Sequence, residues 1–256
     1  MQAYGASFAP IYNLRWGDFA HRVAPALREY YESTPQGKTA RQGVPSLLDL
    51  CCGAGHLAGH FLEQGYLVTG IDLSPAMLEQ ARQNNADYIV AGQARFIQGD
   101  AASYVLDQPV DLALSTFDAL NHLADLPALR GCFASTFRAL KPGGVFIFDL
   151  NTRLGLLRWA AISLQETPDL TLITSGLYDE QSGKAYSRIS GFVRGEDGRY
   201  ERFEETVYET AFDLAAVKSS LLAAGFARVH FARLSNLVEP LPDPETEGRA
   251  FIIASK

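Results

Sequence analysis

Short apolar runs alternate with segments of helical periodicity between residues 46 and 151. The apolar runs predict strands at Ser46–Cys51, Tyr66–Asp72, Ala94–Gln98, Val110–Ser115 and Val145–Leu150. The segments between them predict helices at Gly55–Gln64, Pro75–Asn84, Leu120–Leu123 and Leu126–Leu140. This alternation indicates an α/β fold with a doubly wound, mainly parallel sheet and helices on both faces.

The pattern changes on either side of this region. Residues 1–33 have helical spacing of apolar side chains, and residues 34–45 form a polar linker with proline and glycine. After Thr152, runs rich in β-branched and aromatic residues predict an antiparallel β-meander at Thr171–Tyr178, Ala185–Val193 and Arg199–Tyr208. The chain then predicts a helix at Leu214–Ala224 and strands at Ala227–Leu234 and Arg249–Ser255.

These patterns predict a domain organisation. We expect an N-terminal helical cap and linker at 1–45, and a main domain at 46–256 that carries the meander as a lid insertion at 165–210. Apolar residues make up 47% of the chain and charged residues 20%, as in soluble globular proteins. The net charge of −7 argues against a dedicated nucleic-acid binder, and no apolar run is long enough to span a bilayer.

The beginning of the chain lacks the pattern of a signal peptide, and its three cysteines show no disulfide or metal-binding spacing. His56 and His60 have the spacing of a zinc pair on a helix, but no further ligands accompany them. We therefore expect a cytoplasmic protein without a metal or a membrane partner, either a monomer or a homodimer.

Ligands of doubly wound sheets bind beyond the carboxyl ends of the strands. The residues that end the predicted strands include a small-residue loop and acids at successive strand ends: Cys51–Gly55, Asp72, Asp100, Ser115–Asp118 and Asp149–Asn151. Gly53–Ala58 also satisfies the G-x-G-x-x-A pattern of nicotinamide cofactor sites, with Asp72 near the expected distance. These residues alone leave the identity of the cofactor open.

Several motifs resemble those of class I S-adenosylmethionine-dependent methyltransferases. DLCCGAG at 49–55 is similar to the first, glycine-rich loop of that family, and GIDLSPAML at 70–78 to its second motif. GDA at 99–101, DLALS at 111–115 and LKPGG at 140–144 follow in the family's order. The resemblance implies a seven-stranded Rossmann-like sheet with a reversed final hairpin, and S-adenosylmethionine as cofactor, with S-adenosylhomocysteine as product.

The resemblance also implies roles for particular residues. Asp72 would accept hydrogen bonds from both ribose hydroxyls, and Leu73 and Met77 would pack on the adenine. Asp100 would accept from the adenine amine while the Ala101 N–H donates to a ring nitrogen. The loop with Cys51, Gly53 and Gly55 would bind the methionine moiety near the charge of Asp49, with Ser115 at the end of the fourth strand. Cys51 stands where the family has glycine, which costs energy if φ is positive there.

The first residues resemble the lead-in of small-molecule methyltransferases, including sugar amine N-methyltransferases, in which a tyrosine faces the transferring methyl group. Tyr12 has that position, but Asn13 and Phe19 differ from the family pattern. His122 is our candidate general base, the alternative being a surface histidine. We expect the acceptor to contact Phe117, Asp118, Asn151 and Tyr178.

The sequence therefore predicts a methyltransferase that acts on a nitrogen or oxygen atom of a small molecule. Three alternatives remain open at this point. They are a tRNA or RNA methyltransferase, a non-catalytic cofactor-binding protein and, with least support, an NAD-dependent oxidoreductase. The first would need a basic groove, whereas the lid segment has only scattered lysine and arginine residues.

Overall fold

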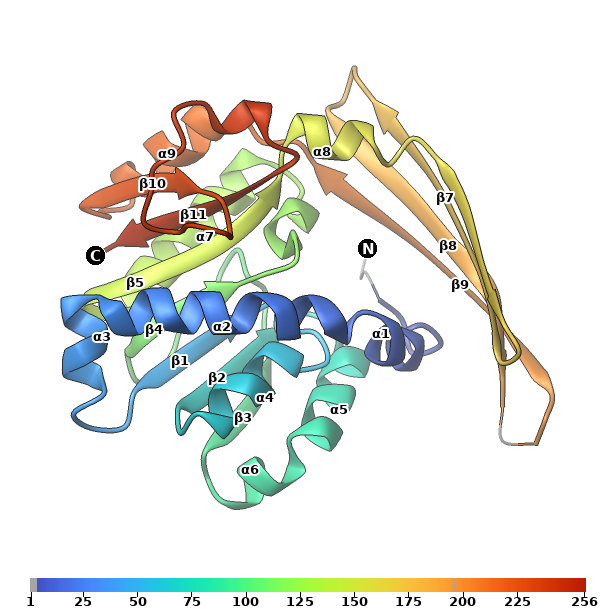
Figure 1. Ribbon diagram of the computed structural model, residues 1–256, viewed down its shortest axis with the longest axis horizontal. Coiled ribbons are helices and arrows are strands. Elements are labelled where there is room, and N and C mark those ends of the chain that lie inside the picture. Colours follow the sequence, from blue (N-terminus) through green and yellow to red (C-terminus); the bar gives the residue numbers. More distant parts are fainter. Residues whose placement is uncertain (1–3, 196) are drawn as a thin grey trace.

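A seven-stranded sheet forms the centre of the molecule, with the strand order β10–β11–β5–β4–β1–β2–β3 (Figure 1). The structure is a computed structural model and describes residues 4–195 and 197–256. The strands are β1 (Ser46–Leu50), β2 (Leu67–Asp72), β3 (Ala94–Gln98), β4 (Val110–Ser115), β5 (Leu140–Asn151), β10 (Arg228–Ala232) and β11 (Arg249–Ser255). Strands β1 to β5 run parallel, and β11 runs antiparallel to both of its neighbours. The predicted doubly wound sheet with a reversed final hairpin is confirmed.

Helices cover both faces of this sheet. Adjacent strand residues point to opposite faces, so Leu47 and Leu48 of β1 belong to two separate apolar clusters. The Leu47 cluster is covered by α2 (Gly17–Ser33), α4 (His56–Glu63) and α5 (Pro75–Asn84). The Leu48 cluster is covered by α7 (Leu126–Ala139) and α9 (Leu214–Ala223). This double cover leaves the strand ends as the place where polar side chains gather.

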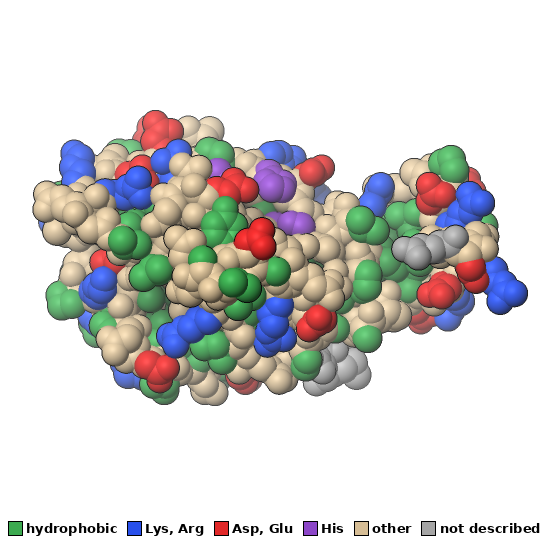
Figure 2. All heavy atoms as spheres, turned by 90° about the horizontal axis from the view of Figure 1, so that it is seen from below, with side chains coloured by type: hydrophobic (Ala, Val, Ile, Leu, Met, Phe, Trp, Pro, Cys, Tyr) green, Lys and Arg blue, Asp and Glu red, His purple; other side chains and the backbone are tan. Residues whose placement is uncertain are grey.

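A second sheet stands beside the main body, with α1 (Ala9–Arg15) between the two (Figure 1). Its antiparallel strands have the order β6 (Ile162–Thr167), β7 (Leu170–Asp179), β8 (Lys184–Arg194) and β9 (Tyr200–Thr210). Figure 2 shows part of the molecule projecting from the main body as a narrower lobe. The predicted meander corresponds to β7–β9, whereas β6 was not predicted. Every residue of β6 is exposed, and its apolar–polar alternation covers only Ile162–Gln165, which is too short to predict a strand.

Other departures from the predicted elements are local. Residues 34–45 contain a short helix, α3 (Pro35–Ala40), which Thr34 caps by accepting a hydrogen bond from the Gly37 N–H. The helix α6 (Ala86–Val90) and the helix α8 (Arg153–Leu157) were also missed. Strand β5 begins at Leu140 and not at Val145 as predicted, and the register between β4 and β5 shifts at Val110–Leu112. Two 3₁₀ turns, η1 (Ala119–His122) and η2 (Pro244–Thr246), complete the described elements.

Candidate active site

The loop between β1 and α4 has an unusual backbone. Cys51, Gly53 and Gly55 have φ values of 58°, 53° and 74°, all in the left-handed region. Glycine adopts this region freely, but an L-residue pays about 1–2 kcal/mol for it. Cys51 therefore does meet the positive φ that makes glycine the favoured residue at this position. Within the turn, the Cys52 N–H donates to the Ile71 carbonyl and the Gly55 N–H to the Cys52 carbonyl.

Asp72, the last residue of β2, holds this loop and the start of α5 together. Its Oδ2 accepts a hydrogen bond from the Gly53 N–H at 2.8 Å, and its Oδ1 accepts one from the Ser74 N–H at 2.8 Å. Burial raises the pKa of Asp72, and these backbone hydrogen bonds oppose the rise. The Leu73 N–H also donates to this carboxylate. A carboxylate has about four lone-pair sites, so Asp72 can still accept a hydrogen bond from a ligand.

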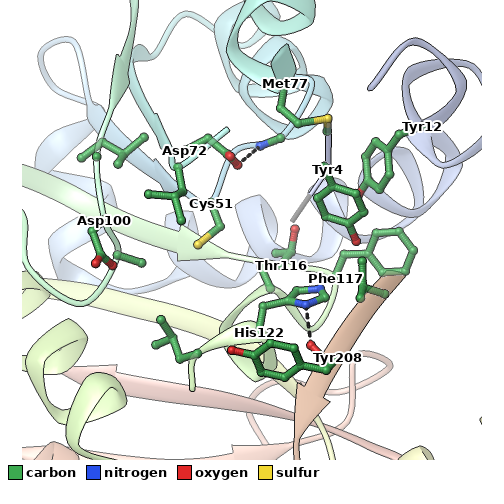
Figure 3. Close-up of a pocket in the computed structure, with 18 of the residues that line it drawn as sticks. Tyr4, Tyr12, Cys51, Asp72, Met77, Asp100, Thr116, Phe117, His122 and Tyr208 are labelled. Carbon is green, nitrogen blue, oxygen red and sulfur yellow. Dashed lines mark hydrogen bonds between the residues drawn. The ribbon is translucent and has the colours of Figure 1, made fainter. Parts of the chain in front are cut away.

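A cavity with about 1070 Å³ of empty space, part of it open to solvent, lies over the strand ends (Figure 3). We call it the strand-end cavity. The predicted site residues on its wall are Tyr12, Cys51, Gly53, Asp72, Leu73, Met77, Asp100, Ala101, Phe117 and His122. In Figure 3, Asp72 and Asp100 lie toward one side, and Tyr4, Tyr12 and Phe117 lie toward the other, near His122. The cavity therefore has a carboxylate side and an aromatic side.

Tyr4 lies on the aromatic side and was not predicted as a site residue. Its ring packs at 5.2 Å from the Tyr12 ring and at 5.8 Å from the His122 ring, measured between centroids. The Tyr4 carbonyl accepts a hydrogen bond from Ser74 Oγ at 2.8 Å, and the next N–H, of Gly5, donates to Glu205 Oε2 at 2.6 Å. The N-terminal segment is thus fixed to both the main body and the second sheet.

Asp49 contributes a buried carboxylate behind the loop. It lines a smaller neighbouring cavity together with Tyr12 and Gly53, and its Oδ2 is buried without a hydrogen-bond partner. Burial raises the pKa of Asp49 to about 8, which a hydrogen bond from the Ala58 N–H partly opposes. An unsatisfied buried carboxylate oxygen is costly, so this position suits a ligand that brings a positively charged donor.

His122, at the end of η1, has both ring nitrogens beside β9. Nδ1 lies 2.8 Å from the carbonyl oxygen of Tyr208, and Nε2 lies 4.0 Å from Glu209 Oε1. A carbonyl oxygen only accepts, so Nδ1 carries the hydrogen and Nε2 has the free lone pair. Burial lowers the pKa of His122, which favours the neutral imidazole near neutral pH. Such a ring can take a proton at Nε2.

A second cavity, of about 1200 Å³ including open space, lies between η1 and the second sheet. We call it the sheet-side cavity. It meets the strand-end cavity at five residues that line both: Tyr4, Tyr12, Phe117, His122 and Val207. Two predicted substrate residues, Asp118 and Asn151, line the sheet-side cavity. The two cavities are therefore neighbours that share a border of mostly aromatic side chains, which includes His122.

Some predicted site residues lie elsewhere. Gly55 is the N-cap of α4 and Ser115 is fully buried, and neither lines the strand-end or the sheet-side cavity. Tyr178 also lines neither of them. Thr174 of the same strand does line the sheet-side cavity, and four further residues carry Tyr178 about 13 Å along β7. Tyr178 thus lies on the same face of β7 as Thr174 but too far along the strand to line the sheet-side cavity.

Arg249, at the start of β11, pairs with two acids at the strand ends. Its guanidinium lies 3.0 Å from Asp118 Oδ1 and also contacts Asp149. Asp149 accepts hydrogen bonds from the backbone N–H groups of Phe117 and Asp118 at 2.8 and 3.0 Å. Sequence analysis found these acids but missed Arg249 and Glu209. Buried acids need a cation, so the sequence indicated that one lies nearby. Only the pairing of β11 with β5 shows that this cation is Arg249.

Comparison with known proteins gives the family. Residues 47–144 match the model of a methyltransferase domain. The chain is 28% identical over 218 residues to a protein of Geobacillus sp. (strain WCH70) that is named as a methyltransferase, covering 84% of this chain and 86% of the relative. It is 30% identical over 172 residues to the ubiquinone biosynthesis O-methyltransferase of Histophilus somni (strain 2336), covering 64% and 67%. The chain belongs to the class I S-adenosylmethionine-dependent methyltransferases.

The fold of the methyltransferase agrees with this assignment. A solved S-adenosylmethionine-dependent methyltransferase from Clostridium acetobutylicum ATCC 824 superimposes with a TM-score of 0.76 at 20% identity, covering 97% of each chain. Family membership decides the question that the glycine loop alone left open, in favour of S-adenosylmethionine over a nicotinamide cofactor. The motif resemblance over residues 46–151 is thereby confirmed.

The methyltransferase has groups that fit this cofactor. S-adenosylmethionine offers an ammonium group, a ribose diol and an adenine ring. The structure offers the partnerless Asp49 Oδ2, the free lone pairs of Asp72 and the carboxylate of Asp100, which also accepts from the Ala102 N–H at 2.8 Å. Acceptors are thus available for the ammonium group, the ribose diol and the adenine amine, and the strand-end cavity has room for a ligand of this size.

Two further observations bear on the other expectations. Within residues 4–195 and 197–256, no group of three or more histidine, cysteine, aspartate or glutamate side chains is placed to hold a metal ion. His56 Nε2 instead lies 3.2 Å from the carbonyl oxygen of Asn13. None of the helices in the same described ranges is both long enough and apolar enough to cross a membrane.

Proposed function

We propose that this methyltransferase transfers the methyl group of S-adenosylmethionine to a nitrogen or oxygen atom of a small molecule held in the sheet-side cavity. The observation that carries this proposal is the shared border of the two cavities, where the Tyr208 carbonyl lies 2.8 Å from His122 Nδ1 and so leaves Nε2 to accept a proton. The relative from Histophilus somni is named as an O-methyltransferase of ubiquinone biosynthesis, which supports a small organic acceptor.

On this proposal, the carboxylate side of the strand-end cavity holds the cofactor. Asp72 accepts from the ribose hydroxyls, Asp100 from the adenine amine, and Ala101 donates its N–H to the ring. Leu73 and Met77 pack on the adenine. Asp49 receives the ammonium group, which ends the isolation of its Oδ2. When bound, the cofactor supplies a methyl group on a positively charged sulfur, which is open to in-line attack by a nucleophile.

The aromatic side then orients the reacting atoms and limits the access of water. Tyr4, Tyr12 and Phe117 belong to the shared border of the two cavities. Burial raises the pKa values of Tyr4 and Tyr12, so both phenols stay neutral. Neutral phenols can donate to or accept from an acceptor without adding charge beside a cationic sulfur. On this proposal the acceptor enters from the sheet-side cavity and places its nucleophilic atom at the border with the strand-end cavity.

His122 acts on the acceptor as a general base. An amine that arrives protonated, or a hydroxyl, must lose a proton in order to attack, and Nε2 of a neutral imidazole can receive it. The hydrogen bond to the Tyr208 carbonyl keeps the proton of the ring on Nδ1 and the lone pair on Nε2. An enzyme that acts on nucleic acid would need a basic groove, whereas Figure 2 shows acidic and basic side chains intermixed on the face in view.

The experiment that tests this proposal is calorimetric titration of the protein with S-adenosylhomocysteine, with NADH as a parallel titrant. We expect saturable binding of S-adenosylhomocysteine and none of NADH. The cofactor-loaded protein is then incubated with small amines, alcohols and phenols, and S-adenosylhomocysteine formation is measured. Binding of NADH alone would overturn the assignment of the cavity. Binding of S-adenosylhomocysteine without turnover of any acceptor would favour a cofactor-binding protein over an enzyme.

A further inference from the structure

Glu209 is a buried acid that β9 brings from the second sheet into the strand-end network. It is only 1% exposed, and its Oε2 accepts a hydrogen bond from Asn151 Nδ2 at 2.9 Å. The other oxygen, Oε1, lies 4.0 Å from His122 Nε2, on the side of the ring where the lone pair is. Glu209 is thus the acid that faces the reactive nitrogen of His122.

Glu209 and Asp118 are neighbouring buried carboxyl groups. Asn151 Nδ2 donates to Asp118 Oδ2 at 2.7 Å as well as to Glu209 Oε2, so the two acids converge on one amide. Two ionised carboxylates that receive the same donor group repel each other, and one proton on the pair removes this repulsion. Burial and the nearby Asp118 raise the pKa of Glu209 well above its usual range. The pair therefore shares one proton, which resides on Glu209 in the resting protein.

The charges around this acid pair do not balance at rest. Arg249 is the cation that contacts the cluster within the described residues, and it pairs with both Asp118 and Asp149. Asp149 and the proton-sharing pair each carry one negative charge, and Arg249 carries one positive charge. The neighbouring His122, Tyr4 and Tyr12 are neutral. The cluster thus has one surplus negative charge beside His122.

We propose that Glu209 is a positioning residue that supplies the counter-charge of His122 during catalysis. This inference rests on the proposed role of His122 as the base. When the acceptor gives its proton to Nε2, the electron pair of the broken bond stays on the acceptor atom and forms the new bond to the methyl group as the methyl–sulfur bond breaks. The proton shared by the acid pair moves from Glu209 to Asp118 at the same stage, and the Glu209 carboxylate then faces the imidazolium.

The arrival of the acceptor's proton on His122 neutralises the surplus charge of the cluster. Before it, the cluster has one unmatched negative charge; after it, Arg249 is matched by Asp149, and His122 by Glu209. The proton within the acid pair only changes its holder, so no group outside the cluster has to take it up. The imidazolium is stabilised because an opposite charge at about 4 Å in a buried site favours the charged form.

Strand β9 controls both nitrogens of the ring through two consecutive residues. The Tyr208 carbonyl fixes the proton on Nδ1, and the Glu209 side chain faces Nε2. The same strand also docks η1, because Asn121 Nδ2 donates to the Thr210 carbonyl at 2.9 Å and Thr210 Oγ1 donates to the Leu123 carbonyl at 2.9 Å. The proton affinity of His122 thus depends on the second sheet being docked.

The test is an NMR titration of the imidazole of His122 in the full-length protein, which needs no acceptor. In Glu209→Gln we expect the pKa of His122 to be lower than in the wild type, since glutamine cannot ionise opposite the imidazolium. The control Glu201→Gln changes an exposed acid on the same strand and should leave the titration unchanged. Superimposable curves for the wild type and Glu209→Gln would overturn the proposal.

A second measurement in the wild type keeps the test decisive if Glu209→Gln does not fold. The side-chain carboxyl of Glu209, labelled with ¹³C, should shift toward its ionised form as the pH falls and His122 becomes protonated. An isolated carboxyl group shifts in the opposite direction. An ordinary shift of Glu209 toward the protonated form over that pH range would overturn the transfer of the proton to Asp118.

Failure of this inference is distinguishable from failure of the proposed function. Binding of S-adenosylhomocysteine tests the cofactor site alone, whereas the two titrations test the His122–Glu209 pair alone. With an acceptor in hand, Glu209→Gln should lower kcat by about tenfold or more, within the range of a base effect, and leave the affinity for S-adenosylhomocysteine unchanged. An unchanged kcat, and an unchanged pH profile, would return Glu209 to a purely structural role.

Discussion

The imidazole of His122 is oriented by the main chain of Tyr208, whose carbonyl oxygen lies 2.8 Å from Nδ1. The two residues come from different bodies of the protein, since His122 ends the turn η1 of the main body and Tyr208 lies on β9 of the second sheet. The tautomer of the ring is therefore set by the contact between the two bodies, and not by its own loop. This relationship makes the role of His122 testable by side-chain removal.

Replacement of His122 by alanine should reduce turnover far more than cofactor binding. We expect His122→Ala to lower kcat by about 10²–10⁴-fold, the usual contribution of a general base. Calorimetry with S-adenosylhomocysteine should give an affinity close to that of the wild type. His21→Ala, in an exposed position of α2, is the matched control. Normal turnover in His122→Ala would leave His122 with a structural role only.

Removal of the Asp72 carboxylate should weaken cofactor binding. Asp72→Ala loses the acceptor for the ribose and also the two hydrogen bonds that hold the Gly53 and Ser74 amides. We expect a loss of about 1–3 kcal/mol in the binding of S-adenosylhomocysteine, measured by calorimetry. Asp87→Ala, on the exposed helix α6, serves as the control. An affinity equal to that of the wild type would remove Asp72 from the cofactor site.

Cofactor affinity should rise with pH because Asp49 must give up a proton. The pKa of Asp49 is about 8 without ligand, and an ammonium group beside it favours the ionised form. Binding is then weaker below this pKa, strengthens as the pH approaches it, and levels off above it. Calorimetry with S-adenosylhomocysteine should show this rise in the wild type and lose it in Asp49→Asn. Parallel pH profiles of the two proteins would contradict the contact.

Arg249 should stabilise the fold, because Asp149 is fully buried beside it. We expect Arg249→Met to lower the free energy of unfolding by about 3–5 kcal/mol, the cost of leaving a buried charge unpaired. Arg249 lowers the pKa of Asp149, so this pKa rises further in the variant. The loss of unfolding free energy is therefore largest at neutral pH and becomes smaller as the pH falls and Asp149 is protonated. Urea denaturation at two pH values measures both effects.

A matched control for this variant is Arg153→Met. Arg153 pairs with Glu180 in an exposed position, where an ion pair contributes only about 0–1 kcal/mol. A loss in Arg249→Met no larger than in Arg153→Met would show that the buried acids do not depend on their cation.

The left-handed backbone at Cys51 should favour glycine. Cys51→Gly and Cys51→Ala both lose the thiol, but only glycine relieves the cost of a φ of 58°. We therefore expect the glycine variant to be more stable than the alanine variant by about 1 kcal/mol in urea denaturation. Equal stability of the two variants would mean that the loop relaxes without this strain.

The β1 loop and the acids at the ends of β2 and β3 could be predicted from sequence, because each follows a short strand that the alternation with helices makes easy to recognise. Tyr4 could not, since it resembles any aromatic residue of a helical pattern and acts through a segment that lies before α1. Glu209 and Arg249 could not be predicted either. Their place depends on how β9 docks against η1 and on the pairing of Arg249 with Asn151 across two strands. Local patterns contain neither relationship.

One peptide group links the two bodies of this enzyme. The carbonyl of Tyr4 receives a hydrogen bond from Ser74 at the start of α5, and the N–H of the same peptide, which belongs to Gly5, donates to Glu205 on β9. A trans peptide is rigid and its two polar groups point in opposite directions, so it holds Ser74 and Glu205 on opposite sides at a fixed separation. A motion that separates β9 from α5 must therefore break one of these two hydrogen bonds or move Tyr4. If the bond to Glu205 holds, widening of the gap between the sheets also withdraws Tyr4 from the border of the two cavities.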